Sequence, residues 1–186
     1  PQVVSPTPKA QRNKKRSRTP RPPKKCPACA TPTVKVEGSV WTICPNRESC
    51  PGQVFQAVKH FVGAMDIEGL GYKTGIALLN KGFIKDPADI YRVTDEQMAE
   101  LDGFATKSIE NLRRAIDASK DRPLWRLLAG LNIRHVGSHV AQVLASAFLT
   151  IDALAAASAD EIDAELDLQI DTLAREGMKY LDLRGV

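Results

Sequence analysis

The sequence predicts a mainly helical chain in which short glycine hairpins recur between helices, preceded by a small four-cysteine module and a basic arm. Three observations support this fold class. All four cysteines fall within a stretch of 25 residues. Beyond them, apolar residues recur at helical spacing, and a glycine-containing turn returns about every 33 residues. Ahead of them, residues 1–25 hold nine basic residues and no acidic one.

The arm over residues 1–25 is rich in proline, so we expect it to be extended and disordered. The net charge of +4 conceals its basicity, because the remaining residues carry 17 basic and 22 acidic side chains. Such a basic arm is typical of a nucleic-acid partner, although a solvated tail has the same composition.

The cysteines have the spacing C-x2-C and C-x5-C, with fourteen residues between the pairs. Two short loops at this spacing can bring four sulfurs to one tetrahedral zinc ion, so the predicted ligands are Cys26, Cys29, Cys44 and Cys50. The segment between the pairs reads as a β-hairpin with Glu37-Gly38 at its turn. Ala30 lies where such loops often carry a glycine that tolerates positive φ, so slight strain is expected there.

Two disulfides are the alternative to zinc. They are disfavoured in a reducing compartment, and the rest of the chain suggests one. No secretory signal or membrane span is evident, so we expect a cytoplasmic protein.

The helical part begins with an amphipathic segment at 53–65 and continues through a turn into 73–81. The turn Gly69-Leu-Gly71 returns as Gly103-Phe-Ala105, and again, less completely, at Gly137. The helices that follow these turns present apolar stripes, which we expect to be Ile109, Leu112 and Ile116 in one and Val140, Val143, Leu144 and Ala147 in the next. Trp125 and its leucine neighbours, Leu124, Leu127, Leu128 and Leu131, are expected in the core.

The connecting helices repeat too, at an offset of 64 residues. Thr94-x-x-Gln97 and Ser158-x-x-Glu161 are both capping boxes, so two helices should start at equivalent points. This register predicts a fourth, degraded hairpin at Asp167-Leu-Gln169. Repeats of this kind stack their apolar faces into a shared core.

A short hairpin ahead of a helix N-terminus suits a phosphate oxygen, because backbone amides and the helix dipole face outward together. Such contacts read the backbone, so sequence-independent DNA binding is predicted. The expected contact residues are Gly69, Gly71, Lys73, Gly103, Ala105, Lys107, Arg134 and Gly137. The simpler interpretation is a plain turn whose glycines only cap helices.

Catalytic signals are absent from the sequence. No Walker, dinucleotide-binding or serine-elbow motif occurs, and the acidic residues are scattered along helical faces. His60, His135 and His139 are interpreted as packing or surface residues, since four cysteines complete a zinc site.

A four-cysteine finger followed by tandem helix-hairpin-helix motifs resembles the bacterial NAD-dependent DNA ligases. The matching stretches include KKCPAC, HFVGAMDIEGLGYK and SKDRPLWRLLAGLNIRHVG. The resemblance covers about residues 26–166 and implies a structural Zn²⁺, contact with nicked duplex DNA, and partner domains elsewhere in a ligase that use NAD and Mg²⁺. It also implies a bacterial protein associated with the nucleoid. This chain has Asn132 where that family usually has glycine. The K-x-D-G motif, which carries the adenylated lysine in the family, does not occur in this sequence.

The resemblance therefore implies the DNA-gripping part of a ligase, which we do not expect to seal nicks alone. The expected domains are an arm at 1–25 that includes the end of an OB-fold, a finger at 26–52, repeats at 53–166 and a degraded or truncated repeat at 167–186. Two alternatives remain open. One is a stand-alone module that binds DNA structures, and the other is a zinc-stabilised protein-interaction segment with decayed hairpins.

Overall fold

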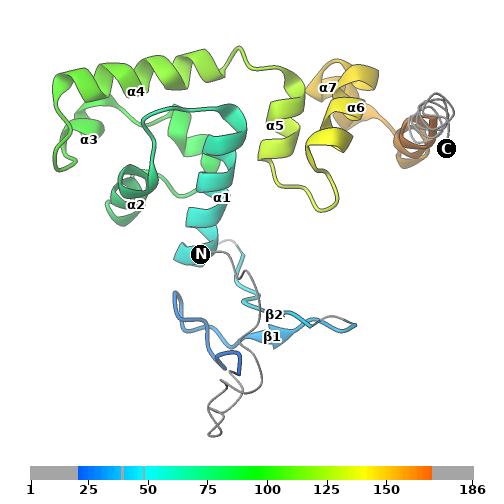
Figure 1. The fold of residues 1–186 in the computed structure, drawn as a ribbon, viewed down its shortest axis with the longest axis horizontal. Coiled ribbons are helices and arrows are strands. Elements are labelled where there is room, and N and C mark those ends of the chain that lie inside the picture. The colour runs from blue at the N-terminus through cyan, green and yellow to red at the C-terminus, as the bar shows by residue number, and fades with distance from the viewer. Residues whose placement is uncertain (1–20, 39, 48, 169–186) are drawn as a thin grey trace, which may run out of the picture. The chain divides into compact units, whose positions relative to one another are not determined.

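The computed structural model describes residues 21–38, 40–47 and 49–168 of the chain. It divides into two compact units that meet at the bond between Asn46 and Arg47 (Figure 1). Most of the predicted basic arm, residues 1–20, and most of the predicted fourth repeat, residues 169–186, lie outside the described residues.

The first unit contains the predicted β-hairpin. Strand β1 (Val34–Lys35) pairs antiparallel with β2 (Thr42–Ile43), with Val34 opposite Ile43. Gly38 has a φ of +70° in the turn, a conformation that costs glycine little. The outer part of the hairpin is exposed, and Trp41 has 71% of its surface accessible.

The second unit is helical, as predicted. Its elements are α1 (Pro51–Met65), α2 (Tyr72–Asn80), the 3-10 helix η2 (Pro87–Tyr91), α3 (Asp95–Ala99), α4 (Thr106–Ser119), α5 (Leu124–Gly130), α6 (Ser138–Phe148) and α7 (Ile151–Ala156). Residues 159–168 are also helical. No described helix has the length and apolarity that crossing a membrane requires.

The larger core lies among α1, α2, η2, α3 and α4. Phe61 and Met65 of α1 and Leu112 and Ile116 of α4 are buried members of it, while Ile109 is only partly buried. Leu78 of α2 is also fully buried there. Helical periodicity places these side chains on one face of each helix, which confirms the stripes predicted for α1 and α4.

A second core joins α5, α6, α7 and the helix at 159–168. Its buried members are Leu128, Ala129, Ala141 and Leu144. Two expectations for this region were wrong. Leu131 is half exposed because α5 ends one residue earlier, and Ala147 is exposed because Ala141 takes the central buried position on α6.

Helices α1 and α5 approach closely and cap each other's C-terminal ends. The His60 ring on α1 lies 2.8 Å from the Ala129 carbonyl of α5, and Arg126 Nη1 on α5 donates to the Ala64 carbonyl of α1 at 3.0 Å. Both carbonyls lie in the last turn of their helix, where intrahelical partners run out. The Ala129 carbonyl also accepts from the Asn132 amide at 3.2 Å. These reciprocal bonds connect the two cores.

Both predicted capping boxes are present. The Thr94 hydroxyl accepts from the Gln97 amide while the Gln97 side chain accepts from the Thr94 amide. The Ser158 amide donates to Glu161 at 2.8 Å, and the Glu161 amide donates back to the Ser158 hydroxyl at 3.3 Å. The bonds from Ser158 hold the pKa of Glu161 below its usual value.

The close approach of α5 to α1 depends on Gly130. A Cβ added there would lie 3.1 Å from Phe61 Cδ2 and 3.3 Å from Ala64 Cβ, whereas one added at Gly63 would meet nothing within 4 Å. We therefore expect Gly63→Ala to raise the free energy of unfolding by roughly 0.5–1 kcal/mol, the usual gain in a helix. We expect Gly130→Ala to lower it, because overpacking costs about 1–3 kcal/mol and exceeds that gain.

Urea unfolding of both variants beside the original chain measures this difference. Both substitutions gain the same methyl group in a helix, so the comparison isolates packing. Equal stability of the two variants would show that Gly130 does not limit the approach of the helices.

Candidate metal centre and nucleic-acid interface

The four cysteines gather at one point. Cys26 and Cys29 lie in a tight turn, where the Ala30 amide donates to the Cys26 carbonyl and the Cys26 amide to the Thr31 carbonyl, both at 2.8 Å. Cys44 follows β2, and Cys50 is the residue before α1. All four Sγ atoms lie within 4.8 Å of one another.

This arrangement fits a tetrahedral zinc ion. Zinc–sulfur bonds of about 2.3 Å put ligand sulfurs roughly 3.8 Å apart. The Sγ atoms of Cys29 and Cys44 are 3.5 Å apart, a non-bonded distance that leaves them close to that spacing. Thiolate sulfur is a ligand that zinc prefers, so the site supports a structural zinc ion.

The Cys44 thiol is hard to ionise without a cation. Burial, together with the neighbouring thiols of Cys29 and Cys26, raises the pKa of Cys44 to about 11. A bound Zn²⁺ reverses this preference because it stabilises thiolates, and the displaced protons are released. Metal affinity should therefore increase with pH.

Ala30 carries the strain expected from the sequence. Its φ is +57°, in the left-handed region that costs a residue with a Cβ roughly 1 kcal/mol or more. Asn132 also has a positive φ, +52°, but with less strain, because asparagine tolerates this region better than most residues.

The three hairpins share one backbone design. The first position has positive φ, at +86° for Gly69, +78° for Gly103 and +70° for His135. The third position, two residues later, is extended and forms the N-cap of α2, α4 or α6. These N-caps are Gly71, Ala105 and Gly137.

The apolar residue between these positions points inward. Leu70 is buried, and Phe104 and Val136 are partly buried against the two cores. This residue anchors the turn, which fixes the direction in which the following amides face.

No described side chain caps α2, α4 or α6. Helices α1 and α5 also lack a side-chain cap, whereas Asp86, Thr94 and Thr150 accept backbone bonds at the starts of η2, α3 and α7. What sets α2, α4 and α6 apart is that each follows a positive-φ turn. The first amides of a helix have no partner inside it, so the hairpin helices present outward amides and a positive dipole end. An oxyanion is the ligand that this arrangement suits.

Basic side chains accompany these N-termini. Lys73 and Lys107 are exposed at the second residue of α2 and α4, and His139 occupies the same place in α6. Arg134 is exposed within the third hairpin. The sequence interpretation missed the equivalence of His135 to Gly69 and Gly103, although its position two residues before Gly137 was a usable signal.

The expected fourth hairpin at Asp167-Leu-Gln169 falls at the edge of the described chain. Residues up to 168 are helical, and Gln169 lies outside the described residues. The degraded repeat therefore stays a prediction.

Comparison with known proteins gives this arrangement a family context. Residues 25–51 match the NAD-dependent DNA ligase C4 zinc finger domain. Residues 61–118 match a SAM-like helix-hairpin-helix tandem, and residues 126–167 match a helix-hairpin-helix motif.

Curated relatives agree with these matches. The chain is 50% identical over 144 residues to a DNA ligase of Roseiflexus sp. (strain RS-1) and 47% identical over 144 residues to one of Frankia casuarinae. It is 42% identical over 144 residues to DNA ligase 2 of Deinococcus deserti. Each similarity covers 76% of this chain, which spans only about a fifth of each relative's length.

The metal centre predicts about one zinc ion per chain, the stoichiometry of a four-sulfur site. Cys29→Ala should reduce bound zinc substantially, because three sulfurs cannot close a tetrahedral structural site. His139→Ala should leave it unchanged, since that exposed ring lies outside the cysteine cluster. Elemental analysis of the purified proteins measures both, and two intact disulfides without metal would contradict the assignment.

The strain at Ala30 predicts that Ala30→Gly tightens the metal site. Glycine removes the left-handed penalty, while its greater freedom in the unfolded chain offsets part of the gain. We expect zinc release to a competing chelator to become about threefold slower or more, which corresponds to roughly 0.7 kcal/mol. Ala155→Gly, in exposed α7, serves as the control and should leave zinc release unaffected. Unchanged release from Ala30→Gly would mean that the turn carries no strain that bears on the metal.

Proposed function

We propose, from its correspondence to the zinc-finger and helix-hairpin-helix segment of NAD-dependent DNA ligases, that this chain grips duplex DNA at nicks for a ligase. The hairpins hold backbone phosphates without reading bases. The finger at 26–52, closed by zinc, and the repeats at 53–166 form the DNA-binding part. The adenylation step, with its NAD and Mg²⁺, belongs to other domains of such an enzyme.

The observation that carries this proposal is the repeated uncapped helix N-terminus behind a positive-φ turn. Gly71, Ala105 and Gly137 begin α2, α4 and α6 without a side-chain cap. A Cβ built at Gly71 or Gly137 meets nothing within 4 Å, so this space lies open to a ligand. Ala105, which already has a Cβ at the equivalent position, agrees with that openness.

Each hairpin residue of the proposed interface has a definite role. Gly69 and Gly103 supply the positive φ, while Gly71, Ala105 and Gly137 let a phosphate approach the amides. Lys73, Lys107 and Arg134 add charge that neutralises the phosphates. Positioning of the nick in this way contributes orientation to ligation, and the bond-making chemistry takes place elsewhere.

The stand-alone DNA-structure-binding module remains the second candidate. It would use the same hairpins, so DNA binding does not separate the two. Restored nick joining, when the chain is supplied as part of a ligase with adenylation and OB-fold domains, favours the ligase role.

The hairpins predict that Gly71→Val weakens DNA binding while the protein stays folded. Gly71 has an ordinary φ of −76°, so valine strains no backbone, and its methyl groups enter the space proposed for the phosphate. We expect Kd for a nicked duplex to rise about tenfold, or roughly 1.4 kcal/mol, the scale of one charge-assisted hydrogen bond.

Fluorescence anisotropy with duplexes of unrelated sequence, measured over a range of salt concentrations, tests this prediction. Affinity should fall steeply with salt and vary little with sequence. Ala155→Val, on exposed α7, adds similar bulk away from any hairpin and should bind as the original chain does. Salt-insensitive binding, or equal weakening by both variants, would contradict the proposed phosphate contacts.

A further inference from the structure

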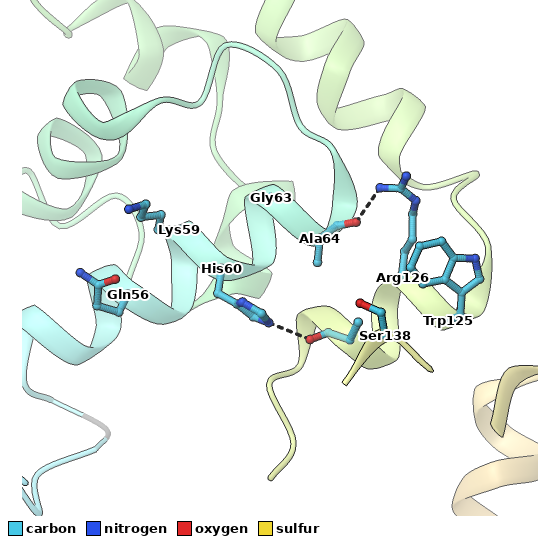
Figure 2. A pocket seen from close by; sticks show the side chains of 9 residues that line it. Gln56, Lys59, His60, Gly63, Ala64, Trp125, Arg126 and Ser138 are labelled. Carbon is cyan, nitrogen blue, oxygen red and sulfur yellow. Dashed lines mark hydrogen bonds between the residues drawn. The ribbon is translucent and has the colours of Figure 1, made fainter. Parts of the chain in front are cut away.

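A basic groove of about 550 Å³ lies beside the third hairpin. Figure 2 shows its walls, with Lys59 and His60 projecting from α1 and Trp125 and Arg126 from α5. Ser138, the first residue of α6, also lines it. The groove therefore adjoins the open N-terminus of α6, which follows the third hairpin.

Acidic residues are absent from the helices that border the groove, although Asp66, just after α1, pairs with Arg122 at 2.7 Å. Residues 49–65, which include all of α1, contain no Asp or Glu, and neither do residues 122–151, which include α5, the third hairpin and α6. The chain has 22 acidic residues in all, so the lack of any carboxylate on these three helices is a pronounced segregation of charge. Hairpins one and two, in contrast, each have a nearby acid, Glu68 and Asp102.

Arg126 is held in a defined position in the groove, whereas Lys59 extends from its wall. Arg126 lies with its guanidinium 5.0 Å from the centre of the Trp125 ring and donates through Nη1 to the Ala64 carbonyl, which leaves further donors on the same group. Lys59 is exposed and has no ion pair among the described residues. Gly130 lets α1 and α5 pack closely, which places the two helices that carry Lys59 and Arg126 side by side.

We propose that this groove is an additional phosphate site for the DNA backbone, continuing from the third hairpin, with Lys59 and Arg126 as its charged contacts. The inference rests on the proposed function of the hairpins. When one phosphodiester binds at the α6 N-terminus, the next phosphates of the same strand lie beside the groove. There they face Lys59 and Arg126, which have no ion pair among the described residues. Since the groove offers cations and no carboxylate, an anionic backbone is the ligand it suits.

Lys59 gives the cleanest test, because its side chain is exposed and the bonds between α1 and α5 do not involve it. Each phosphate contact contributes about one unit to the slope of log Kd against log salt. We expect Lys59→Ala to reduce that slope by about one and to weaken binding several-fold at low salt. Lys59→Arg keeps the charge and should retain the original slope.

Lys120→Ala is the matched control, since Lys120 is an exposed lysine outside the groove and is paired with Asp117 at 2.7 Å. It should leave the slope unchanged. A Lys59→Ala slope equal to that of the original chain, alongside weakened binding by Gly71→Val, overturns the groove while leaving the hairpin function intact. Absence of DNA binding by the original chain overturns both.

Discussion

The contact between α1 and α5 is the constraint on which most of this helical unit depends. Each helix supplies a side chain that bonds to a last-turn carbonyl of the other, through His60 and Arg126. Gly130 makes this exchange possible because any larger residue would push against Phe61. The first core, around α1 and α4, and the second, around α5 and α6, are joined in this way. Both the position of the third hairpin and the groove beside it follow from this junction.

All three hairpins have positive φ at their first position, although only two of them have glycine there. Positive φ at the first position is met by Gly69 and Gly103, and in the third hairpin by His135. Histidine is found in this left-handed region more often than most residues that have a Cβ. The substitution also places a polar ring where glycine would leave bare backbone. Repeats can therefore drift in sequence while they keep one geometry.

Much of this arrangement could be predicted from the sequence, because its signals are local. Cysteine spacing indicated the sulfur cluster, the two capping boxes fixed where α3 and the helix at 159–168 begin, and the doubt about Ala30 was confirmed by its φ. The misses involve contacts between distant segments. The burial of Ala141 and the exposure of Ala147 depend on where α5 packs. The sequence does not distinguish Gly130 from other helix glycines, because its role depends on Phe61 of another helix. The residues that line the groove come from segments some 65 positions apart.

The missing side-chain caps on α2, α4 and α6 have a thermodynamic consequence. Compared with a capping side chain, alanine at the N-cap costs about 1 kcal/mol and glycine only a few tenths, so α4, which begins behind Ala105, forgoes the most stabilisation. An oxyanion that takes the position acts as a cap supplied from outside the chain. Ligand and fold are then linked: occupancy should raise the melting temperature and slow hydrogen exchange at these helix starts. The starts of α2, α4 and α6 are therefore the places where a bound oxyanion would add stability that the chain itself does not supply.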